Sequence, residues 1–261
     1  MKKIVLNILT ATLLMVVCIG CGGGGDRMRM TVEGSGEVSF SLNGSGMVTV
    51  DWGDGSSRII RELDGNRTSF SRVYSGSGRR TITITGNEIT ELSVGNERLT
   101  NLDVRHNIQL RRLSVSGGQL TSLDLRNNTA LTNLIVGNIP LTNLDVSRNT
   151  ALTNLFVSHT QLTSLDVSNS AGLTELVVGN NQLTSLDVSN NTNLQSSLRV
   201  NDNQLTASAL NALFESLPQG YRRWDSWEQR YIYSHQISIF NNPGTNEANT
   251  SIASARGWVV W

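Results

Sequence analysis

The chain has 261 residues and carries 21 Lys or Arg against 21 Asp or Glu, so its formal net charge at pH 7 is zero. Without a basic excess, the composition predicts no binding surface for nucleic acids. Aromatic residues make up only 5% of the chain. A core filled by large rings is therefore not expected, and regularly stacked Leu and Val side chains are favoured.

The first twenty residues have the composition of a secretory leader. Lys2 and Lys3 are the only lysines, and the mostly apolar run Ile4–Ile19 comes after them. This run is short for a membrane-spanning helix and has the position of a signal-peptide core. We therefore predict a signal peptide over residues 1–20, with an uncleaved membrane helix as the alternative. Its removal would leave 19 arginines against 21 acids.

The end of this leader resembles a bacterial lipobox. The string Cys18-Ile19-Gly20-Cys21 has a small residue before the second cysteine, with Cys18 in the place of the usual leucine. The resemblance implies lipidation of Cys21 as the only membrane attachment and a Gly-rich tether over residues 21–27. By similarity to Gram-negative lipoproteins, Gly22 after the cysteine implies the outer membrane, and we expect the cell surface. No second cysteine would remain for a disulfide.

Residues 28–88 carry strand signals and almost no helix signals. Short alternating runs from Met28–Val32 to Arg80–Thr85 are separated by turns rich in Gly, Ser and Asn, which predicts a small antiparallel β-sandwich. The string Val50-Asp51-Trp52-Gly53-Asp54-Gly55, with Tyr74 and the run Thr81–Thr85, resembles PKD-like domains. The resemblance implies an immunoglobulin-like sandwich that acts as a spacer or interaction module. The short segment Thr85–Glu91 leaves little room for a linker and predicts direct stacking on the next module.

Self-similarity is the strongest signal in the chain. A six-residue unit, LxxLxV in outline, recurs in steps that alternate between 10 and 11 residues, so the full period is 21 residues with two half-coils per coil. One coil cannot bury its apolar row, whereas stacked coils bury a continuous Leu/Val core. The unit begins at Ile89, Leu99, Leu110, Leu120, Leu131, Leu141, Leu152, Leu162, Leu173 and Leu183.

Every second unit fits the leucine-rich-repeat outline LxxLxLxxNxL, which predicts a leucine-rich-repeat solenoid over residues 89–206. The segment Leu173–Leu183 fills the outline completely, and a sixth coil fits after a one-residue insertion. The intervening half-coils should form the other wall. The arrangement resembles repeat proteins among the surface lipoproteins of Gram-negative gut bacteria. The asparagine position is otherwise irregular, so we expect an incomplete asparagine ladder: Glu97, Gly118, Ile139 and Thr160 occupy it.

Residues 207–261 have the pattern of a small α/β cap that covers the last coil. Ala207–Leu217 has helical periodicity and is stopped by Pro218. Tyr231–Phe240 alternates like a strand, and Asn249–Arg256 is a second short helix candidate. A mainly β fold results, with a PKD-like sandwich, a solenoid and this cap.

No catalytic constellation is visible. His106, His159 and His235 are the only histidines and fall on different parts of the expected fold. A nucleophile needs a positioned base, and no motif for a metal, phosphate or dinucleotide occurs. We therefore expect neither an enzyme nor a cofactor.

Two groups of aspartates raise the question of calcium. Asp51 and Asp54 flank a Gly turn, and a ladder of aspartates recurs at one place in every second half-coil. Bound calcium would relieve their repulsion. The alternative, which we favour, is that each carboxylate accepts hydrogen bonds from its own turn and that Trp52, between Asp51 and Asp54, packs in the core. We therefore assign no metal site. The ladder is Asp103, Asp124, Asp145, Asp166 and Asp187.

The best candidate site is the outward face of the strand wall. Ile135, Phe156 and Val177 should form an exposed apolar stripe, and such patches often mark contacts with partners. The alternative is that these residues contact the protein's own N-terminal module or are isolated surface residues. Arg112, Asn154 and His159 complete the candidate set. Trp224 and Trp227 are a second candidate, since both rings could stack on sugars, with packing in the cap as the alternative.

These features predict a monomeric, surface-anchored binding protein that presents a repeat surface to a protein or glycan ligand. Two alternatives stay open at this point. The chain could be a structural cell-surface lipoprotein without a dedicated ligand, or an accessory factor in glycan processing. No interaction with nucleic acid is expected.

Overall fold

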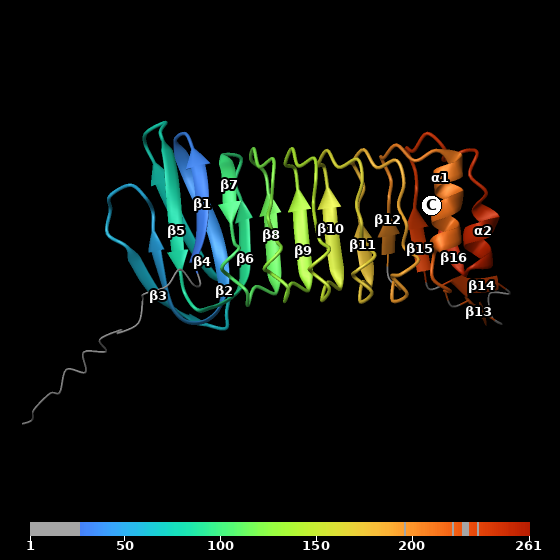
Figure 1. The fold of residues 1–261 in the computed structure, drawn as a ribbon, viewed down its shortest axis with the longest axis horizontal. Helices are drawn as coiled ribbons and strands as arrows, with labels where there is room; N and C mark the ends of the chain where they lie inside the picture. Colours follow the sequence, from blue (N-terminus) through green and yellow to red (C-terminus); the bar gives the residue numbers. More distant parts are fainter. Residues whose placement is uncertain (1–26, 196, 221, 226–229, 234) are drawn as a thin grey trace, which may run out of the picture.

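The computed structural model describes residues 27–195, 197–220, 222–225, 230–233 and 235–261. These residues form sixteen strands and two helices, arranged as a rod with the N-terminal strands at one end and the helices at the other (Figure 1). Fourteen of the strands belong to one continuous, branched sheet, and the other two form a separate hairpin. No helix among the described residues is long and apolar enough to cross a membrane.

The middle of the rod is a solenoid of the leucine-rich-repeat type, as the period predicts. Its strand wall is a parallel ladder in which each strand pairs with the strand one coil later. Leu113, Leu134, Leu155 and Leu176 lie side by side in this register and are fully buried. The strands of this wall are β6 (Glu88–Gly95), β8 (Arg112–Ser116), β9 (Asn133–Gly137), β10 (Asn154–Ser158), β11 (Glu175–Val177) and β12 (Ser197–Arg199).

The intervening half-coils form the second wall, but only the first of them is a regular strand within the described residues. This strand is β7 (Leu99–Asp103), and the later half-coils run as turns. Their leucines still point inward, since Leu123, Leu144 and Leu165 are at most 8% exposed. The alternating sequence therefore sets which side chains are buried on both walls, although strand pairing is regular on one wall alone.

An asparagine ladder that we did not predict holds the second wall together. Asn128, Asn149 and Asn191 are fully buried, and each donates two hydrogen bonds from its Nδ2 to carbonyls of the preceding coil. Asn149, for example, donates to the carbonyls of Leu125 and Asn128 at 3.1 and 2.8 Å. Buried carbonyls left unpaired are costly, so this ladder replaces the missing strand pairing.

One position of this ladder is occupied by Ser170, whose buried hydroxyl has no partner among the described residues. A serine is too short to bridge to the preceding coil. We expect Ser170→Asn to supply the two missing hydrogen bonds and to raise the free energy of unfolding by up to about 1 kcal/mol. The reverse change, Asn149→Ser, should lower it by about 2 kcal/mol. Urea denaturation followed by circular dichroism measures both, and a destabilised Ser170→Asn variant would contradict this interpretation.

The N-terminal strands continue both walls of the solenoid. Strand β2 (Gly36–Asp51) pairs through its first half with β4 (Thr68–Tyr74) and β6, and through its second half with β3 (Ile59–Asp64) and β5 (Arg79–Thr85). Strand β1 (Arg27–Glu33) joins β5 to β7. The first half of β2 therefore extends the strand wall, and β5 with β1 extends the second wall, so the direct stacking expected from the sequence is observed.

The two layers of N-terminal strands enclose the aromatic residues of the chain's first third. Phe40 stacks on Phe70 with ring centroids 5.3 Å apart and lies 5.6 Å from Trp52. The hydroxyl of Tyr74 donates to the carbonyl of Trp52 at 2.7 Å. Trp52 is 1% exposed, so the expectation that it packs in the core is confirmed.

Gly44 lies where the two layers separate, at the point where the pairing of β2 with β6 changes register. Its φ is +150°, and a Cβ there would lie 2.0 Å from the carbonyl oxygen of Glu88. We expect Gly44→Ala to lower the free energy of unfolding by about 3 kcal/mol, because strain and a backbone clash add. Gly46→Ala is the control, since Gly46 has φ +76° but open space around it. It should lose only about 1 kcal/mol in the same urea titration.

The C-terminal end closes the last coil. Helix α1 (Ala207–Ser216) buries Leu210, Leu213 and Phe214, close to the predicted range. Strands β15 (His235–Ser238) and β16 (Trp258–Val260) extend the strand wall in parallel beyond β12. Helix α2 (Thr250–Ala255) contacts α1 and β16.

The single strand expected over Tyr231–Phe240 is not continuous. Strand β14 (Arg230–Tyr233) pairs antiparallel with β13 (Arg222–Asp225), whereas β15 pairs with the solenoid. The alternation in the sequence is therefore shared by two strands with different partners, and local periodicity cannot separate them.

Candidate functional site

Two rows of side chains cover the outward face of the strand wall, at the positions predicted from the repeat. Strand pairing places the members of each row beside one another and continues both rows onto β2. The first row is Asn43, Glu91, Arg112, Asn133, Asn154, Glu175 and Ser197, and the second row is Ser41, Ser93, Ser114, Ile135, Phe156, Val177 and Arg199.

Side chains of the first row bond mainly to one another. The Nδ2 of Asn133 donates to the Oδ1 of Asn154 at 3.1 Å, and the Nδ2 of Asn154 donates to a carboxylate oxygen of Glu175 at 3.3 Å. The hydroxyl of Thr153 also donates to the Oδ1 of Asn154. Most of the hydrogen-bonding capacity of Asn154 is thus used within the wall. We therefore regard Asn154 as support for the wall's shape, and its contact with a ligand stays a prediction.

The second row contains the predicted apolar stripe, which we define as Ile135, Phe156 and Val177. Phe156 is paired with Ile135 on one side and with Val177 on the other. Ile135 is 40% exposed, and the other two are half-buried. The N-terminal strands lengthen the wall sideways and leave Ile135 open, so they are not the cover that the alternative interpretation required. Ile135 is therefore the exposed member of the stripe, and contact of the stripe with another molecule stays a prediction.

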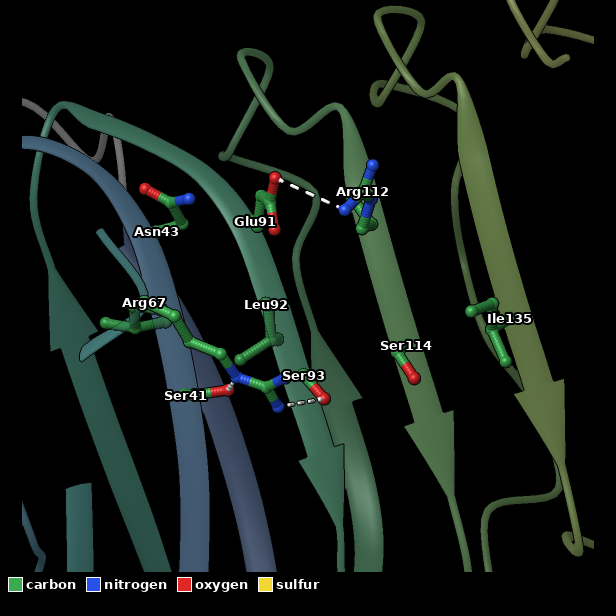
Figure 2. A pocket seen from close by; sticks show the side chains of 10 residues that line it. Ser41, Asn43, Arg67, Glu91, Leu92, Ser93, Arg112, Ser114 and Ile135 are labelled. Atoms are coloured by element: carbon green, nitrogen blue, oxygen red, sulfur yellow. Dashed lines mark hydrogen bonds and ion pairs between the residues drawn. The ribbon is translucent and has the colours of Figure 1, made fainter. Parts of the chain in front are cut away.

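A depression of about 180 Å³ adjoins the stripe, where β2, β6 and β8 meet. It exists because three consecutive members of the second row, Ser41, Ser93 and Ser114, have short side chains, while longer ones surround them. Figure 2 shows this floor of serines with Arg67 on one side, Glu91 and Arg112 on another, and Ile135 at the far end. We call this feature the serine depression.

Arg67 is the residue of this site that sequence reasoning missed. It precedes β4, and its guanidinium reaches across β2, where Nε donates to the hydroxyl of Ser41 at 2.7 Å and Nη2 to that of Ser93 at 3.3 Å (Figure 2). Ser41 is only 6% exposed. Arg112, which we did predict, lines the same depression and lies 3.7 Å from a carboxylate oxygen of Glu91.

His159 lies outside both rows, at the corner after β10. Its φ is +54°, and Asn138 and Asn180 occupy the equivalent corners with φ +54° and +57°. The left-handed region is accessible to Gly, Asn and His at lower cost than to most residues. The backbone geometry therefore explains the residue type at this corner, and a contact of His159 with a ligand stays a prediction.

The aspartate ladder of the second wall is explained by its turns. In each aspartate the Oδ1 accepts the backbone N–H two residues later, at 2.8–3.2 Å. Arg105 and Arg126 also pair with Asp103 and Asp124. In the N-terminal turn, Asp51 and Asp54 accept turn amides and pair with Arg58 and Arg72. No group of three or more acidic, His or Cys side chains within the described residues has metal-site geometry.

A carboxylate bonded in this way resists protonation. The guanidinium of Arg126 lowers the pKa of Asp124 from its usual 3.8 to about 2, and the amide of Arg126 acts in the same direction. The ionised form is favoured in the folded state, so its stabilisation is present above about pH 4 and is lost as the pH falls towards 2. We expect Asp124→Asn to be less stable than the wild type by about 1 kcal/mol at pH 7.

Urea titrations of the wild type and Asp124→Asn between pH 7 and 2.5 test this expectation. The difference between the two proteins should shrink below pH 4. Asp187 accepts the amide of Ser189 and has no arginine partner among the described residues, so Asp187→Asn is the control and should have a smaller effect at pH 7. A difference that stays constant down to pH 2.5 would contradict the assignment.

The three histidines differ in their exposure to solvent. His106 and His159 are exposed, whereas His235 is 2% exposed with its ring 5.0 Å from that of Trp258. Burial lowers the pKa of His235.

The predicted leader, lipidation site, tether and tryptophan pair lie wholly or partly beyond the part of the chain that the structure describes. Cys21, residues 1–20 and Trp227 fall outside the described residues, and the side chain of Trp224 does as well. The predictions of lipidation and of sugar stacking therefore rest on the sequence.

No protein-family model matches the chain, and no curated protein matches it either. Among solved structures, the functional domain of InlJ from Listeria monocytogenes, described as including a cysteine ladder, is similar with a TM-score of 0.49 and 26% identity over 64% of this chain and 33% of that one. An internalin, InlF, from Listeria monocytogenes has a TM-score of 0.47 and 21% identity over 60% of this chain and 43% of that one. This chain thus spans less than half the length of either structure. Its only cysteines, Cys18 and Cys21, precede the repeats.

Proposed function

We propose that this chain is a binding protein of the bacterial cell surface, held to the outer membrane by a lipid on Cys21, which uses its strand wall to bind another macromolecule. The observation that carries the proposal is the apolar stripe. Ile135, Phe156 and Val177 succeed one another on three neighbouring strands, and within the described residues no segment of the chain covers Ile135.

The side chains around the apolar stripe also favour the binding of a ligand there. The first row is rigid because its side chains are bonded laterally, so an approaching partner need not order them. Apolar contacts at the centre with polar groups around them are the usual composition of a protein interface. These properties favour a protein ligand over a glycan, because Phe156 is the one aromatic side chain in the two rows and its ring is half-buried between Ile135 and Val177.

We further propose that the N-terminal strands are a PKD-like domain that serves as the first cap of the solenoid. Its hydrogen bonds to β6 and β7 support this role. A flexible spacer would not share two layers of strands with the repeats. The boundaries 28–88, 89–206 and 207–261 remain our proposed division, and we expect a monomer without enzymatic activity.

The test is a binding screen with the chain from residue 22 onward, which contains every described residue, against extracellular-matrix proteins and a glycan array. A ligand of the strand wall should bind at least tenfold more weakly when Ile135, Phe156 and Val177 are all changed to Ser, because central apolar contacts dominate interface energies. Dissociation constants from biolayer interferometry measure this loss.

The matched control changes three other exposed apolar residues, Met47, Ile60 and Val73, to Ser. These residues lie on the N-terminal strands outside the two rows and should leave the affinity unchanged. Equal losses in both triple variants would place the ligand elsewhere. The absence of any ligand in either panel would favour the structural role, and a glycan whose binding survives both changes would favour the cap.

A further inference from the structure

We propose that the serine depression is a carboxylate-binding pocket, in which Arg67 anchors an Asp or Glu side chain of the protein partner. This inference rests on the proposed function of the strand wall and adds the chemistry of the group that the wall recognises. It is carried by three observations: the state of the Arg67 guanidinium, the charge and size of the depression, and its continuity with the apolar stripe.

Arg67 is a cation that the protein orients without neutralising. Two neutral hydroxyls, those of Ser41 and Ser93, accept its hydrogen bonds at 2.7 and 3.3 Å. Within the described part of the chain, the ion pairs involve other arginines, and no carboxylate lies at ion-pair distance from Arg67. A guanidinium has five N–H donors, so the side that faces the depression keeps donors for a ligand. Its orientation is already fixed, so binding sacrifices little side-chain entropy.

The net charge of the depression is positive. Arg67 and Arg112 line it together with the single acid Glu91. Glu91 is engaged by Arg112 at 3.7 Å, and Figure 2 shows this pair on the side of the depression away from the Arg67 guanidinium. One positive charge is therefore left over, and it is carried by Arg67. An anion is the ligand whose charge complements this site, and a carboxylate matches the planar fork of a guanidinium.

The volume of the serine depression favours a small chemical group as its ligand. A volume of about 180 Å³ equals that of roughly six water molecules in the liquid, which suits the end of an Asp or Glu side chain. The hydroxyls of Ser93 and Ser114 on the floor offer further hydrogen bonds to the same oxygens. A nucleic-acid backbone or a lipid headgroup would need a broader cationic surface than one unneutralised arginine.

Continuity with the apolar stripe identifies the source of the carboxylate. Ile135 belongs both to the depression and to the stripe. Three strand spacings of about 4.8 Å separate Ser93 from Phe156, or about 14 Å across the wall. An extended segment rises about 3.3 Å per residue, so an acid above Ser93 and an apolar residue above Phe156 would be about four residues apart. Residues four apart in a strand face the same side.

The experiment pans a phage-displayed random dodecapeptide library on the chain from residue 22 onward. Enriched peptides should carry Asp or Glu about four residues from an apolar residue. The strongest peptide and its amide counterpart, with Asn or Gln in place of the acid, are then synthesised and titrated. Arg67→Gln should weaken the acidic peptide about tenfold, and the amide peptide should show no further loss on the same variant.

Matched variants isolate the role of Arg67. Arg61→Gln removes an arginine that lies over the ring of Phe70 on the N-terminal strands, and it should bind the peptide as the wild type does. Arg112→Gln should have a smaller effect than Arg67→Gln, because Arg112 already has Glu91. Arg67→Lys keeps the charge but not the fork, and it should give an intermediate affinity. It also serves if Arg67→Gln folds poorly by circular dichroism.

Different failures overturn different statements. The carboxylate pocket would be overturned, and the wall kept as a binding surface, if the enriched peptides carried no acid. The same follows if Arg67→Gln and Arg67→Lys bind the peptide as the wild type does while the triple variant of Ile135, Phe156 and Val177 loses binding. Peptides that bind the triple variant as well as the wild type, or no enrichment over bare support, would overturn the proposed use of the wall itself.

Discussion

The repeat of 21 residues matters because backbone hydrogen bonds and leucine burial must coincide in every coil. A coil by itself has one apolar row and no second layer to cover it. Stacking solves this only if each leucine falls beside the leucine of the next coil, as Leu134 does beside Leu155. Any change of register would displace every outward side chain at once. The two outward rows, the apolar stripe and the serine depression are therefore consequences of that single alignment.

The same requirement shapes the ends of the rod. An uncovered coil would expose both its leucines and a row of unpaired amides. At the N-terminal end, β2 and β1 supply strands to the two walls, and the bend at Gly44 lets β2 take part in both layers. At the other end, β15 and β16 continue the strand wall while α1 covers the leucines. The ends differ in architecture because strands extend both walls at the N-terminal end, whereas at the C-terminal end strands extend the strand wall alone.

Much of the fold was predictable from the sequence, because a unit repeated ten times averages out local noise. The sequence correctly predicts which Leu and Val side chains are buried and which positions of the strand wall face outward. It also correctly predicts helix α1 and the burial of Trp52. The asparagine ladder was not predicted, because the repeat outline places its asparagine on the other half-coil. The signal was nevertheless present: the spacing is 21 residues, or 42 where Ser170 intervenes, in Asn107, Asn128, Asn149 and Asn191. Arg67 could not have been found. Its partners lie 26 residues away on either side, and only the pairing of β4, β2 and β6 brings them together.

The position of β1 has a mechanical consequence. This strand is the first described element of the chain and is hydrogen-bonded along both edges, to β5 over seven residue pairs and to β7 over four. Tension applied through the residues that precede β1 would therefore enter the molecule between β5 and β7. The pull would have to slide β1 out from between its neighbours, breaking many hydrogen bonds together instead of peeling them one by one. In the proposed lipid-anchored protein, shear flow would load the rod through this doubly paired strand.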